Sequence, residues 1–173
     1  MTDADRAADL TRLCRTCGVC CNGVMFAYVE VEKSEMRADT RRRLHVLEAE
    51  NRFTLPCCEH GPEGCQVYDD RPSICRSYTC ALYDEYKETG EELDRKLMRV
   101  ERIKQLVATI RARRRGAADH EWLPRAISEM LAVGKPTDVE RELLLDVAEL
   151  AMRLQRDIGW SPKPIEKAPE PGD

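Results

Sequence analysis

The sequence predicts a mainly α-helical protein: an irregular, cysteine-rich N-terminal half organised by metal, with at most a short β element, and an α-helical C-terminal half. All nine cysteines lie between Cys14 and Cys80. Glycine and proline interrupt that stretch, and long helical apolar patterns appear only after it. We therefore expect a cysteine-cluster metal-binding domain over residues 1–80, a helical extension packed on it over 81–160, and a disordered, proline-rich tail over 161–173.

The N-terminal half offers few regular elements. Residues 2–13 are expected to form a short helix, and Gly18 and Gly23 mark the first cysteine cluster as a loop. β-Branched and aromatic residues make 24–31 the best strand candidate, and 32–50 show a patchy helical pattern. Glycines and prolines keep 56–74 irregular.

The C-terminal half carries three predicted helices. The first has an apolar stripe from Leu93 to Ile110 and ends in an arginine-rich segment before Gly116. The second lies between Pro124 and Gly134. The third begins with a capping box at Thr137 and runs to about Gly159. The basic runs at 41–43 and 111–115 are interpreted as solvated helix faces.

Composition and charge exclude several classes. The net charge of −4 lacks the basic excess of a general nucleic-acid binder. No run of 18 apolar residues could span a membrane, and the polar N-terminus does not resemble a signal peptide. We therefore expect a cytoplasmic protein without nucleic-acid or membrane partners. In a reducing compartment an odd number of clustered cysteines favours metal or redox chemistry over disulfides.

The cysteines form two groups with the spacing of a metal site. The first, CRTCGVCC, places Cys14, Cys17 and Cys20 in a C-x2-C-x2-C loop, with Cys21 adjacent. The side chains of adjacent residues diverge, so Cys20 and Cys21 are expected to face two metals, or one metal and the core. The second group supplies the remaining ligands: Cys65, Cys75, Cys80 and one or both of Cys57 and Cys58. Eight thiolates suit two four-coordinate ions or two iron–sulfur clusters.

The two groups together resemble the YkgJ-type cysteine-cluster proteins, the zinc- or iron-chelating CxxCxxCC domains. The resemblance rests on CRTCGVCC and on the later C-x7-C-x2-Y-x2-RP-x2-CR-x-Y-x-C pattern, and it covers residues 14–80. It implies metal or iron–sulfur cluster binding. Cys57 is preferred over Cys58 because its spacing to Cys65 fits the pattern. The implied ligands are Cys14, Cys17, Cys20, Cys21, Cys57, Cys65, Cys75 and Cys80.

Several residues around the cysteines are candidates for further members of the site. Arg71 and Arg76 are expected to offset the negative charge of a thiolate-bound cofactor, iron–sulfur cluster or zinc. Tyr68 and Tyr78 are expected to shield the site from water. His60 could be a ligand, but with so many thiols available we interpret it as a turn histidine.

Two other functions stay open. Some larger relatives look like enzymes that methylate lysine on flagellin, which implies an iron–sulfur-dependent modifying enzyme. However, no glycine-rich motif follows a strand, so a Rossmann domain for S-adenosylmethionine is not expected. The other alternative is a structural zinc module whose C-terminal helices bind a protein partner.

Overall fold

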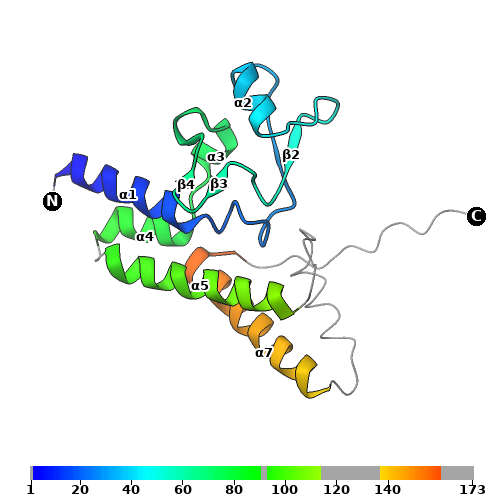
Figure 1. The fold of residues 1–173 in the computed structure, drawn as a ribbon. Coiled ribbons are helices and arrows are strands. Elements are labelled where there is room, and N and C mark those ends of the chain that lie inside the picture. The colour runs from blue at the N-terminus through cyan, green and yellow to red at the C-terminus, as the bar shows by residue number, and fades with distance from the viewer. Residues whose placement is uncertain (1, 91–92, 114–136, 161–173) are drawn as a thin grey trace, which may run out of the picture.

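The computed structural model describes residues 2–90, 93–113 and 137–160, and it is mainly helical (Figure 1). Its α-helices are α1 (Asp3–Cys17), α2 (Ala38–Arg43), α3 (Ser73–Ser77), α4 (Ala81–Thr89), α5 (Leu93–Arg113) and α7 (Asp138–Arg153). Its strands are β1 (Tyr28–Glu30), β2 (Arg52–Thr54), β3 (His60–Gly61) and β4 (Gly64–Cys65). A 3₁₀ turn spans Tyr68–Asp70, and one π-helical turn, Leu154–Ile158, follows α7.

Helices α1, α4, α5 and α7 pack together as a helical layer (Figure 1). Helix α1 begins at Thr2, whose hydroxyl accepts the Asp5 N–H (3.1 Å), and it packs Leu10 and Leu13 into the layer. The predicted apolar stripe of α5 is buried at Val100, Ile103, Val107 and Ile110. These residues, with others from the four helices, form the first hydrophobic core.

A second, smaller core lies in the part of the chain between α1 and α4. Strands β1 and β2 pair antiparallel, with Tyr28 opposite Thr54 and Glu30 opposite Arg52. This second core consists of Val31, Met36, Leu44, Phe53, Leu55 and Val67. In Figure 1 these short elements lie on one side of the helical layer. Cys17 and Cys80 pack against the first core, and Cys57, Cys65 and Cys75 pack against the second.

Several predicted boundaries differ from the structure. Helix α1 continues past residue 13 to Cys17, so the first two cysteines are helical. The reason is that Leu10, Leu13 and Cys17 lie on one buried face, which the thiol extends. The strand predicted over 24–31 is only Tyr28–Glu30, and the helix predicted within 32–50 is only α2.

The basic runs are not simply solvated faces. Arg41 is buried and pairs with Glu48 (2.8 Å), and its guanidinium also donates to the Glu32 carbonyl (3.2 Å). Arg111 is half-buried and donates to the Asn22 carbonyl, so α5 contacts the loop directly after Cys21. Charged side chains therefore hold the second core and the cysteine loop in place.

The division into domains at residue 80 stays a prediction. Helix α1 packs against α4 and α5, so residues on both sides of position 80 share the first core. The helix predicted between Pro124 and Gly134, and the tail over 161–173, lie outside the described residues. Among the residues that are described, no helix is long and apolar enough to cross a membrane.

Candidate metal centre

The motif cysteines lie on several different helices and strands and in the turns beside them. Cys14 and Cys17 occupy the last turn of α1, which Gly18 ends in the left-handed conformation (φ 59°). Cys20 and Cys21 lie in the turn that follows. The Cys57 N–H, after β2, donates to the Cys21 carbonyl (2.8 Å). The others are Cys65 in β4, Cys75 in α3 and Cys80 just before α4.

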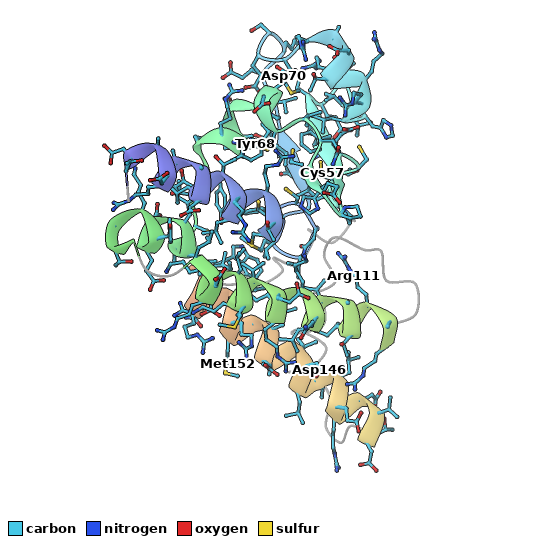
Figure 2. All side chains as sticks on the ribbon, turned by 60° about the vertical axis from the view of Figure 1, so that its left-hand side comes forward. Cys57, Tyr68, Asp70, Arg111, Asp146 and Met152 are labelled. Atoms are coloured by element: carbon cyan, nitrogen blue, oxygen red, sulfur yellow. The ribbon has the colours of Figure 1, made fainter. Side chains whose placement is uncertain are left out.

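All eight cysteines of the motif line one cavity of about 720 Å³. Most of the remaining wall is apolar and includes Val19, Met25 and Phe53. Cys58 is not among the lining residues: its side chain is exposed and its thiol donates to the Arg43 carbonyl (3.1 Å). Figure 2 shows Cys57 in the upper part of the molecule and Arg111 below it on α5.

The thiols are spread around the cavity rather than gathered at one point. Cys20 and Cys21 had been expected to diverge, but their sulfur atoms lie 3.8 Å apart. In residues 2–90, 93–113 and 137–160, no three His, Cys, Asp or Glu side chains lie close enough together to hold a single metal ion.

Burial keeps most of these thiols protonated in the metal-free chain. It raises the pKa of Cys17 and Cys75 to about 12 and that of Cys57 to about 11. Cys20 is the exception, because the hydrogen bond from the Cys21 thiol lowers the pKa of Cys20 and raises that of Cys21. Metal binding would therefore release protons from the site.

Arg71 lies at the thiols, whereas Arg76 lies outside them. An Arg71 Nη1 nitrogen is 3.7 Å from the Cys14 sulfur, and the guanidinium stacks 3.6 Å from the centre of the Tyr68 ring. Arg76 is exposed and donates to the Arg71 carbonyl. The structure thus places Arg71 as a direct neighbour of sulfur and Arg76 as a residue that acts on the backbone of Arg71.

The aromatic side chains stand at the cavity wall. Tyr68 and Tyr78 both line it, and Tyr78 packs edge-to-face against Phe26 with ring centres 5.5 Å apart. Burial raises the pKa of Tyr78, and the nearby Cys80 thiol adds to this effect. Tyr78 therefore stays neutral as part of an aromatic wall beside the thiols.

His60 is a cavity residue that the sequence interpretation assigned to an ordinary turn. The imidazole lines the cavity, and its Nε2 atom is buried without a hydrogen-bond partner. It fits there because Gly18 has no side chain: a Cβ at Gly18 would stand 2.1 Å from Nε2. The C-x2-H spacing from Cys57 is a signal that could have pointed to His60.

A helical chain whose eight motif thiols surround one cavity is a cysteine-cluster protein. Residues 13–100, just over half of the 173 residues, match the CxxCxxCC family model, described as "Putative zinc- or iron-chelating domain", and the chain belongs to that family. This confirms the resemblance drawn from the motifs. No curated protein and no solved structure matched the chain.

Proposed function

We propose that this chain binds iron–sulfur clusters through the thiolates of its eight motif cysteines. The observation that carries the proposal is that these eight cysteines line one cavity, whereas Cys58 faces away from it. Hydrophobic packing alone does not explain why eight thiols line one cavity. Family membership supports the coarser statement, that the chain chelates zinc or iron.

The size of the cavity favours clusters over lone zinc ions. Four thiolates around Zn²⁺ at about 2.3 Å form a compact site, with sulfur atoms roughly 4 Å from one another. The cavity of about 720 Å³ is far larger, and its thiols do not converge on a point. Clusters of several iron and sulfide ions are held by four thiolates spread around them, which fits this arrangement.

The wall of the cavity suits a charged cluster. Apolar residues such as Met25, Phe53 and Leu55 limit contact with water. The guanidinium of Arg71 offsets negative charge, and its position over the Tyr68 ring holds it beside Cys14. A bound cluster would supply electron transfer or structural support, and these residues would set its access to solvent.

Analysis of the protein purified without oxygen tests the proposal. We expect a brown protein that contains iron and acid-labile sulfide in similar amounts, with little zinc. Exposure to air should bleach it. A colourless protein that carries zinc and no sulfide would instead support the structural zinc module, and would contradict the cluster proposal.

A second candidate function is an iron–sulfur-dependent enzyme that modifies proteins. The observation that favours it is that the cavity extends beyond the thiols to residues of β1 and α3, among them Ile74 and Ser73. Glu30, Glu32 and Glu35 line this end. Their carboxylates would attract a cationic side chain such as lysine.

Peptide binding to the metal-loaded protein tests this second candidate. A lysine peptide should bind more tightly than the same peptide with norleucine, and the difference should shrink as salt is added. Glu30→Gln/Glu32→Gln should lower the affinity for the lysine peptide only. Equal binding of the two peptides would remove the support for this candidate.

A further inference from the structure

We infer that the eight thiols form two separate four-thiolate centres, one beside each hydrophobic core. This inference rests on the proposed function and adds which thiols act together. The helix-side set is Cys14, Cys17, Cys20 and Cys80, and the strand-side set is Cys21, Cys57, Cys65 and Cys75.

The first support is the packing of the cysteines. Cys17 and Cys80 pack against the first core, formed by α1, α4, α5 and α7. Cys57, Cys65 and Cys75 pack against the second core. Cys17 and Cys80 are therefore held by a different part of the molecule from Cys57, Cys65 and Cys75.

The second support is which thiols lie near one another. Cys17 interacts electrostatically with Cys14, Cys20 and Cys80, all of the helix-side set. Cys75 interacts with Cys57 and Cys65 of the strand-side set, and more strongly with Cys20 of the helix-side set. Contacts that cross between the sets involve Cys20, which neighbours Cys21 and Cys75.

The third support is the backbone around the adjacent pair. Cys20 follows the end of α1 and neighbours the thiols of that helix. Cys21 is tied to the other side, because its carbonyl accepts the Cys57 N–H (2.8 Å). The contact of 3.8 Å between the two sulfur atoms makes this pair the junction of the two centres.

Arg71 stands between the two sets. Its positive charge acts on Cys14 and Cys20 of the helix-side set and on Cys65 and Cys75 of the strand-side set. The half-buried guanidinium of Arg71 therefore acts on thiols of both sets.

Two double variants, each lacking two thiols, test the assignment after anaerobic reconstitution with Fe²⁺ and sulfide. Cys17→Ser/Cys80→Ser removes two ligands from the helix-side set only. We expect this variant to bind about half as much iron as the wild type. The bound iron should be released at the same chelator concentration as iron from the wild type. Cys17→Ser/Cys65→Ser removes one ligand from each set. We therefore expect all of its bound iron to be released at a lower chelator concentration than iron from the wild type. Cys58→Ser is the matched control and should hold the full amount.

Identical iron content and identical release in the two double variants would overturn the inference. A second measurement needs no variant: native mass spectrometry during reconstitution should show a half-loaded wild-type species, and a single all-or-none step would contradict two centres. A wild-type chain that takes up no iron under these conditions would instead contradict the proposed function itself.

Discussion

Arg71 is the residue whose position says most about the charge of the site. Because its guanidinium lies 3.7 Å from the Cys14 sulfur, Arg71→Ala should lower metal affinity about 10- to 100-fold without emptying the site. Arg76→Ala should have a smaller effect, since the guanidinium of Arg76 donates to the Arg71 carbonyl and not to a sulfur atom. A chelator titration of both variants measures this. Equal midpoints for Arg71→Ala and the parent would contradict the role of Arg71.

Gly18 is a second residue whose substitution should destabilise the protein. Its backbone is left-handed (φ 59°), and a Cβ would stand 2.1 Å from His60 Nε2. Gly18→Ala should therefore lower the free energy of unfolding of the metal-loaded protein by roughly 1–3 kcal/mol. Urea denaturation provides the measurement.

Gly61→Ala is the matched control for Gly18→Ala. An added Cβ there would meet its nearest neighbour, Gln66, at 3.9 Å, which is ordinary van der Waals contact. We expect a change within about 0.5 kcal/mol. If both alanine variants unfold at the same urea concentration, the contact between Gly18 and His60 does not matter for stability.

At the scale of single residues, the sequence was most informative about which cysteines line the cavity. The resemblance to the cysteine-cluster family favoured Cys57 over Cys58, and the structure places Cys57 in the cavity wall and Cys58 at the surface. The contacts of His60 and Arg111 could not be predicted from the sequence, because they depend on segments far away in the chain. A run of arginines does not reveal that one of them reaches the carbonyl of Asn22.

At the scale of elements, the contact between α5 and the cysteine loop is open to test. Arg111 is half-buried, and burial lowers its pKa; its guanidinium donates to the Asn22 carbonyl. Arg111→Ala should cost about 1–3 kcal/mol of stability and should speed the loss of metal from the adjacent Cys21. Thermal or urea unfolding and a release assay measure the two effects.

Arg113→Ala on the same helix is the control. Arg113 is more exposed and pairs with Asp146 at 2.5 Å on the solvent side of α5 and α7. An exposed ion pair contributes at most about 1 kcal/mol, and no cysteine is involved. Faster metal loss in Arg113→Ala than in Arg111→Ala would contradict the proposed link between α5 and the loop.

Helices could be predicted from the sequence where a long apolar stripe decides them, as in α5 and α7. The ends of helices near the cysteines were less predictable. A cysteine that packs in the core was interpreted as a metal ligand, so it was not counted in the apolar pattern of the helix. Helix α1 illustrates this, since Cys17 extends its buried face. The strands are only two or three residues long, which is too short for alternation to locate their ends.

At the scale of the whole molecule, the two cores should respond differently to metal removal. The second core has few large apolar residues, so its folding depends on metal, which can contribute on the order of 10 kcal/mol. The helical layer has a larger core of its own. Trypsin should therefore cut the chelated protein early at sites such as Arg43 and Arg52, while α5 and α7 survive longer.

The metal-loaded protein digested in parallel is the control, and mass spectrometry of the fragments locates the cuts. Circular dichroism of the same samples should show most of the helical signal retained after chelation. An unchanged cleavage pattern between residues 18 and 80 would show that this region folds without metal, contrary to the prediction.

Alkylation of the cysteines in the metal-loaded protein, mapped peptide by peptide, tests the central claim most directly. We predict that Cys58 alone reacts rapidly, and that all nine cysteines react after chelation and unfolding. Rapid alkylation of any of the eight cavity cysteines while metal is bound, or a pattern that chelation leaves unchanged, would contradict it.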